Sequence, residues 1–100
     1  MSLELADLTE RVIGCAITVH RILGPGFLEA IYERALAVEL RRNQISIETQ
    51  VERPVIYRGE EVGRQRYDLL VEDRLVVELK TVTALDDIHF AQTRAYLKAL

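Results

Sequence analysis

Residues 67–80 constrain the fold of this chain more than any other segment, because they read as two short strands joined by a tight acidic turn. Three charged residues, Asp68, Glu78 and Lys80, stand inside the otherwise apolar strands. A charge in a half-buried strand is costly unless it is paired or bound to a metal ion. The hairpin is therefore either a salt-bridge cluster or an active site.

The segments around this hairpin predict an α/β protein with an α+β arrangement. Apolar residues spaced three and four apart predict two N-terminal helices, over 5–23 and 27–42. Extended segments on short turns predict a three-stranded antiparallel meander with a bulge or break at Pro54, its strands lying over 45–57, 62–71 and 75–80. A third helix is predicted to begin at Asp86-Asp87 and to run to residue 100.

Length and composition narrow the classes of protein that the chain can belong to. One hundred residues predict a single domain over 1–100, and the third helix has no stop signal, so we expect a C-terminally truncated domain. The single Cys15 excludes an intrachain disulfide and is typical of a cytoplasmic protein. No apolar run is long enough to span a membrane, and the net charge of −3 argues against a protein that mainly coats nucleic acid.

The length of the hairpin turn decides whether the two carboxylates lie together. If the loop has two residues, 72–73, then Asp68 and Glu78 point to opposite faces of the sheet. If it has three residues, 72–74, then Asp68 lies directly opposite Glu78, with Cβ atoms roughly 5 Å apart. Because like charges in that position repel, the second register needs a cation between or beside the two carboxylates.

Two interpretations of the charged hairpin follow. In the first, Asp68 and Glu78 hold Mg²⁺, for which Mn²⁺ can substitute, because Mg²⁺ takes one or two carboxylates together with water. Lys80 would then contact a phosphate or help to orient and deprotonate the attacking water. In the second, Lys80 simply forms an ion pair with Asp68 or Glu78 across an exposed sheet face.

Three further residues are candidates for the same site. Gln92 and Tyr96 lie four apart, on one face of the predicted third helix, and are either boundary residues or groups that hydrogen-bond a substrate phosphate or the catalytic water. Glu29 follows Gly26 by three residues. It is either a surface carboxylate in the first turn of a helix, favoured there by the helix dipole, or a third carboxylate aimed at the metal.

Together these residues resemble the PD-(D/E)XK nuclease superfamily. Asp68 followed by Glu78-Leu79-Lys80 is similar to its signature, and the order of helix, three-stranded meander and helix is similar to its core. Residues 92–96, Gln-Thr-Arg-Ala-Tyr, resemble the Gln-x-x-x-Tyr element of its RecB-like branch. Residues 26–32, Gly-Phe-Leu-Glu-Ala-Ile-Tyr, resemble the signature of the small bacterial GxxExxY proteins of that superfamily.

The resemblance implies a restriction-endonuclease-like fold and a Mg²⁺-dependent nuclease, a nucleic-acid-binding hydrolase that acts on DNA or RNA, with DNA favoured over RNA. It implies that Asp68 and Glu78 are the metal ligands, that Lys80 is the catalytic lysine, and that Glu29, Gln92 and Tyr96 complete the active site. Related proteins continue into a further strand beside the one that carries Glu78. We expect its absence here to expose an apolar edge, which favours a homodimer.

Two other functions compete with this interpretation. A catalytically silent binding or assembly module of the same fold is favoured by the small size, the acidic charge and the lack of a basic groove in the sequence. A metal-dependent hydrolase of a small phosphate ester would use the same residues on a different substrate.

Overall fold

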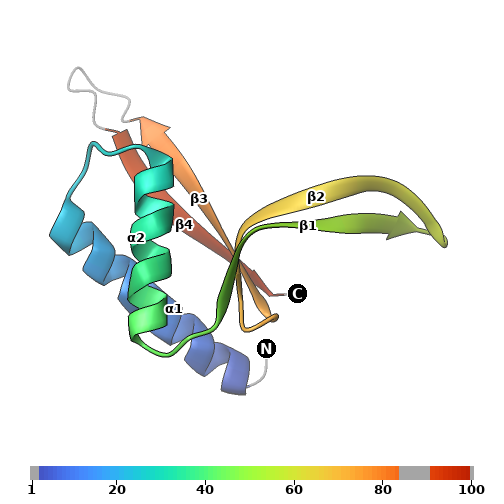
Figure 1. The fold of residues 1–100 in the computed structure, drawn as a ribbon, viewed down its shortest axis with the longest axis horizontal. Coiled ribbons are helices and arrows are strands. Elements are labelled where there is room, and N and C mark those ends of the chain that lie inside the picture. Colours follow the sequence, from blue (N-terminus) through green and yellow to red (C-terminus); the bar gives the residue numbers. More distant parts are fainter. Residues whose placement is uncertain (1–2, 84–90, 100) are drawn as a thin grey trace.

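The computed structural model describes residues 3–83 and 91–99. Two helices, α1 (Leu3–Leu23) and α2 (Glu29–Arg42), precede an antiparallel sheet of order β1-β2-β3-β4 (Figure 1). Its strands are β1 (Ile47–Tyr57), β2 (Glu60–Val71), β3 (Leu75–Thr83) and β4 (Ala91–Ala99). The predicted α+β arrangement of two helices followed by an antiparallel meander is confirmed, and it is consistent with a restriction-endonuclease-like fold.

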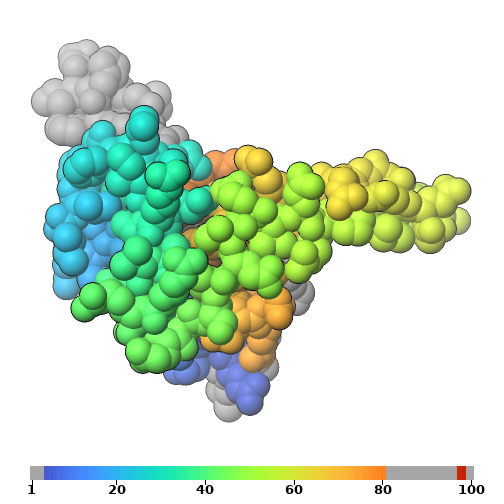
Figure 2. All heavy atoms as spheres, in the orientation of Figure 1, coloured from blue at the N-terminus to red at the C-terminus, as the bar shows by residue number. Residues whose placement is uncertain are grey.

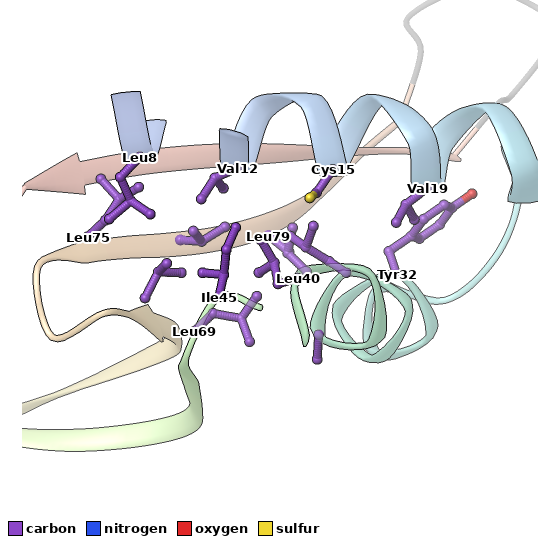
Figure 3. Packing of buried hydrophobic residues seen from close by; sticks show 14 residues of the cluster. Leu8, Val12, Cys15, Val19, Tyr32, Leu40, Ile45, Leu69, Leu75 and Leu79 are labelled. Atoms are coloured by element: carbon purple, nitrogen blue, oxygen red, sulfur yellow. The ribbon is translucent and has the colours of Figure 1, made fainter. Parts of the chain in front are cut away.

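The main core lies between the two helices and one face of β2 and β3 (Figure 3). The residues that α1 contributes recur at spacings of three and four, as a buried helix face requires, and are Leu8, Val12, Cys15 and Val19. Alternate residues of the strands complete the core, and these are Leu69, Val71, Leu75, Val77 and Leu79. In the described residues, neither helix is long and apolar enough to cross a membrane.

The C-terminal segment is a strand, so the predicted third helix is wrong. Residues 91–99 form β4, which pairs with β3 along its whole length, from Leu75 with Ala99 to Thr83 with Ala91. The sequence of β4 also alternates small or apolar residues with polar ones, a period of two that suits a strand, and β3 offers it an open edge. The helix start predicted at Asp86-Asp87 lies outside the described residues.

The pairing of β4 also corrects the expectation of an exposed sheet edge. The strand that carries Glu78 has a neighbour on each side, β2 and β4. The apolar edge that favoured a homodimer is therefore covered by residues of the same chain.

Strands β1 and β2 form a long hairpin that leaves the body of the protein (Figures 1 and 2). We call residues 51–67 of this hairpin the arm. The register shifts between Val55 and Ile56, whereas Pro54 pairs in register with Arg64 within an unbroken strand, so the irregularity predicted at Pro54 lies one residue beyond it. The radius of gyration is 15.0 Å, against about 13 Å for a compact domain of this length, and the arm accounts for the difference.

Candidate active site at the fork between β2 and β3

The candidate site lies where β2 parts from β3. Three residue pairs join the two strands, Leu69 with Val77, Leu70 with Val76, and Val71 with Leu75. This is the register of the three-residue turn, 72–74. The same register carried one residue further places Asp68 opposite Glu78, and there the ladder stops because β2 turns away into the arm (Figure 1). We call this point the fork.

The turn that fixes this register is held from outside the hairpin. Glu72 and Asp73 both have positive φ, 51° and 54°, and the N–H of Arg74 donates to the carbonyl of Val71 at 2.9 Å. The Glu72 N–H donates to the Ser46 carbonyl, and the Ser46 N–H donates to Glu72 Oε1, each at 2.9 Å. The segment before β1 therefore stabilises the three-residue loop, in which two non-glycine residues have left-handed backbone.

At the fork, the side chain of Asp68 replaces the backbone of β2 as a hydrogen-bond partner of β3. Its Oδ2 accepts a hydrogen bond of 2.8 Å from the backbone N–H of Leu79. Because β2 no longer pairs with β3 beyond Leu69, that N–H would otherwise face the gap between the diverging strands. A carboxylate that accepts a backbone N–H in a half-buried position is fixed in orientation, and its other oxygen is left for a further ligand.

Glu78 and Lys80 follow each other on one face of β3, because strand residues alternate and the intervening Leu79 is buried with the core. Glu78 is half-buried and Lys80 is exposed. Within the described residues, Lys80 forms no ion pair with Asp68 or Glu78. The simple salt-bridge interpretation of the hairpin therefore does not hold in this structure.

A carboxylate that the sequence interpretation overlooked lies close to the fork. Glu33 is one helical turn after Glu29 on α2, and its Oε1 accepts a hydrogen bond of 2.6 Å from Gln50 Nε2. The pKa of Glu33 is raised, first by partial burial and then by the negative charges of Asp68 and Glu29, against the hydrogen bond from Gln50 and the charge of Arg34. The spacing of four from Glu29 was the one signal in the sequence that could have found it.

Gln50 marks the bend of β1 beside the fork. Its φ is 51°, a left-handed conformation that is rare for a residue with a side chain. On either side of it β1 pairs normally with β2, through Thr49 with Leu69 and Val51 with Tyr67. The bend lies across from Asp68, so it coincides with the point where the arm leaves the sheet.

The loop before α2 sets the position of Glu29. Tyr32 is buried, its hydroxyl donates to the Gly24 carbonyl, and the Phe27 N–H donates to the Tyr32 oxygen at 3.4 Å. Gly26 has φ of 101°, which a side chain would strain. Tyr32 thus ties down the loop that leads into Glu29, the first and half-buried residue of α2.

Gln92 and Tyr96 were expected on a helix and instead belong to β4. In the backbone register of β3 and β4, Tyr96 pairs with Glu78 and Gln92 pairs with Val82. In a helix, residues four apart would lie next to each other on one face. In a strand they are separated along its length. Tyr96 therefore lies level with Glu78, and Gln92 lies further along β3.

The described residues contain no group of three or more histidine, cysteine, aspartate or glutamate side chains close enough to hold a metal ion. The two carboxylates on β2 and β3 at the fork are Asp68 and Glu78. Two shallow hollows lie elsewhere, one of about 220 Å³ beside the β2–β3 turn and one of about 190 Å³ between α1 and α2.

Comparison with known families agrees with this geometry. The family model described as the PD-(D/E)XK nuclease superfamily matches residues 6–100. The chain belongs to the PD-(D/E)XK nuclease superfamily. Searches of curated proteins and of solved structures found no match.

Proposed function

We propose that this protein is a nuclease that hydrolyses phosphodiester bonds of DNA with the help of Mg²⁺. The observation that supports the proposal is the register of β2 and β3, whose last pair is Leu69 with Val77, so that Asp68 and Glu78 are the next residues of the two strands at the fork. Two half-buried carboxylates in that position repel, and the described residues give neither of them an ion-pair partner. A bound cation would remove that repulsion.

The donor chemistry fits Mg²⁺, with Mn²⁺ as its substitute. Mg²⁺ is usually bound by one or two carboxylates, and water and substrate phosphate fill its remaining positions. Asp68 and Glu78 provide such a pair, and the hydrogen bond from Leu79 holds the Asp68 carboxylate in place. Members of this superfamily generally use divalent metal ions, which supports the same assignment.

In the proposed reaction, each residue of the fork has a separate role. A divalent ion bound there polarises the phosphoryl oxygen and lowers the pKa of water. Asp68 and Glu78 would hold the ion. Lys80, exposed two residues beyond Glu78, binds the scissile phosphate and stabilises the negative charge that develops on it, or orients the attacking water.

Three other residues complete the proposed site. Glu29 adds a carboxylate from the start of α2, whose position Tyr32 fixes through the preceding loop. Tyr96 and Gln92, on β4, hydrogen-bond the substrate phosphate or the catalytic water. The backbone register of Tyr96 with Glu78 supports this role more strongly for Tyr96 than for Gln92.

We also propose that the chain belongs to the GxxExxY subfamily and acts in the cytoplasm. The motif of residues 26–32 has a physical basis in this structure, because its glycine has positive φ and its tyrosine anchors the loop before its glutamate. The buried, unpaired thiol of Cys15 suits a reducing compartment.

Cleavage of labelled single- and double-stranded DNA in Mg²⁺ or Mn²⁺ tests the proposal. The chain has two lysines, Lys80 and Lys98, so Lys98→Ala is a matched control that removes the same charge elsewhere in the sheet. We expect Lys80→Ala to lose at least about 100-fold in kcat and Lys98→Ala to keep wild-type activity. Unchanged cleavage by Lys80→Ala would overturn the assignment of Lys80.

A further inference from the structure

The arm is the part of the molecule whose structure the proposed active site does not explain. Residues 52–66 are all exposed. Figure 2 shows the arm extending away from the body of the protein. An isolated two-stranded ribbon is marginally stable in water. Four large apolar side chains are exposed near its tip: Val55, Ile56, Tyr57 and Val62. A partner that covers these apolar side chains would stabilise such a ribbon.

The charges of the arm favour an anionic partner. The arm has four arginines and three glutamates, a net charge of +1, in a chain of net charge −3, so the rest of the chain carries −4. Arg64 lies 3.8 Å from Glu52 and 3.3 Å from Glu61, so this cluster of three charges keeps a net charge of −1. What remains is three arginines and one glutamate, namely Arg53, Arg58, Arg66 and Glu60.

The three remaining arginines are spread around the ribbon. Arg53 pairs in register with Gln65, and Arg66 pairs with Glu52, one position along. Because adjacent strand positions point to opposite faces, Arg53 and Arg66 lie on the two faces of the arm. Arg58 is at the tip, with its guanidinium 5.7 Å from the centre of the Tyr57 ring. Arginines on both faces of a narrow ribbon suit contacts with the two phosphate backbones that border a DNA groove.

The width of a two-stranded ribbon favours duplex DNA over duplex RNA as the partner. The major groove of B-form DNA, about 12 Å wide, admits a two-stranded β-ribbon. The major groove of A-form RNA is too deep and narrow for side chains to read. With about 3.3 Å per residue, the seven residues of β1 in the arm extend over roughly 20 Å, the rise of about six base pairs.

We infer that the arm lies in the major groove of duplex DNA and holds the duplex against the fork. Arg53 and Arg66 contact phosphates on the two sides of the groove, Arg58 contacts phosphate at the tip, and the apolar tip faces base edges. The position of the arm supports this role, because Asp68 is the residue that directly follows it. The inference rests on the proposed nuclease function for its choice of substrate.

Binding of a fluorescent 20-base-pair DNA duplex in EDTA tests the inference without catalysis. The test variant carries Arg53→Gln, Arg58→Gln and Arg66→Gln, and the matched control carries Arg21→Gln, Arg41→Gln and Arg42→Gln on the exposed surface of the helices. We expect the arm variant to bind DNA at least about 10-fold more weakly and to lose about two to three units of the slope of log K against log salt concentration. The control is expected to lose less than one unit of slope.

Three results would overturn the inference. One is equal weakening by the arm variant and the control, and another is equal affinity of the wild type for duplex RNA of the same sequence. The third is a wild-type dimer in sedimentation that Ile56→Ser with Val62→Ser dissociates, together with no DNA binding, since the arm would then be a self-association surface. Circular dichroism of each variant confirms that it is folded.

Hydrolysis of bis(p-nitrophenyl) phosphate separates this inference from the proposed function. The arm cannot influence so small a phosphodiester, so the arm variant is expected to hydrolyse it at the wild-type rate. Arm-dependent DNA binding without any hydrolysis would contradict the nuclease proposal and support the arm. Metal-dependent hydrolysis without arm-dependent binding would support the nuclease proposal and contradict the arm.

Discussion

The carboxylate of Asp68 accepts a hydrogen bond from the backbone N–H of Leu79, across the point where β2 and β3 part. One side chain therefore has two tasks. It satisfies a backbone donor that the diverging strand has left, and in the proposed site its second oxygen is a metal ligand together with Glu78. The two tasks can be separated by mutation, because an amide oxygen can perform the first and is a poor substitute for the second.

Asp68→Asn and Asp68→Ala should differ in stability and agree in activity. Asparagine keeps an oxygen for the Leu79 N–H, so we expect its free energy of unfolding to fall by less than about 1 kcal/mol. Alanine leaves a part-buried donor unsatisfied and should cost about 1–3 kcal/mol. Both variants should lose at least about 100-fold in cleavage rate. Urea unfolding and DNA cleavage measure the two effects, and equal stabilities would show that the bond contributes nothing.

The register of the hairpin shows what the sequence could and could not predict. Alternation of apolar residues located β2 and β3, yet it left open whether two or three residues form the turn, because each choice is locally acceptable. The choice is made by a contact distant in sequence, the reciprocal hydrogen bonds between Ser46 and Glu72. Local patterns therefore identified Asp68 and Glu78 as candidates, and tertiary structure decided the register in which they directly follow the last pair, Leu69 with Val77.

The error in the C-terminal segment has the same origin. Residues 91–99 contain three alanines and no glycine or proline, which favours a helix, while their alternating polarity suits a strand equally well. The open edge of β3 decides between them, and that edge is a property of the folded sheet. Glu33 was missed because its contact with Gln50 depends on the left-handed bend of β1, which no local pattern predicts.

The charge of Glu33 should lower stability at neutral pH. Its pKa is raised above 4.5, so the folded protein prefers the protonated form. Stability is therefore lost as the pH rises from the unfolded pKa through the raised folded pKa, and the loss is constant above it. Glu33→Gln keeps an acceptor for Gln50 and removes the charge. We expect a higher melting temperature than wild type at pH 7 in EDTA, by a small amount because Glu33 is only partly buried.

The pH dependence distinguishes this effect from a general change in charge. The gain from Glu33→Gln should vanish below about pH 4, where wild-type Glu33 is protonated in both states. The exposed Glu10, on α1, offers a control, and Glu10→Gln should change the melting temperature little at either pH. A gain of the same size at pH 4 and pH 7 would contradict an origin in the ionisation of Glu33.

The hydroxyl of Tyr32 should stabilise the loop before α2. Tyr32→Phe keeps the ring, which stacks on His20 with centroids 5.4 Å apart, and removes the hydrogen bonds to Gly24 and Phe27. We expect a loss of about 1 kcal/mol, or about 4–8 °C in melting temperature for a domain of this size. Because the loop positions Glu29, cleavage should also slow. Thermal unfolding together with kcat checks both, and an unchanged melting temperature would mean that the hydroxyl does not hold the loop.

Titration of Mn²⁺ into the wild-type protein, followed by calorimetry, tests most directly that the fork is a metal site. We expect wild type to bind Mn²⁺ and Glu78→Gln to bind at least about 10-fold more weakly, because an amide replaces one of two charged ligands. Glu60→Gln, at the far end of the arm, removes the same charge and should bind like wild type. A wild-type protein that does not bind Mn²⁺ would contradict a metal-dependent nuclease site at Asp68 and Glu78. So would a Glu78→Gln variant that binds Mn²⁺ as tightly as wild type and Glu60→Gln do.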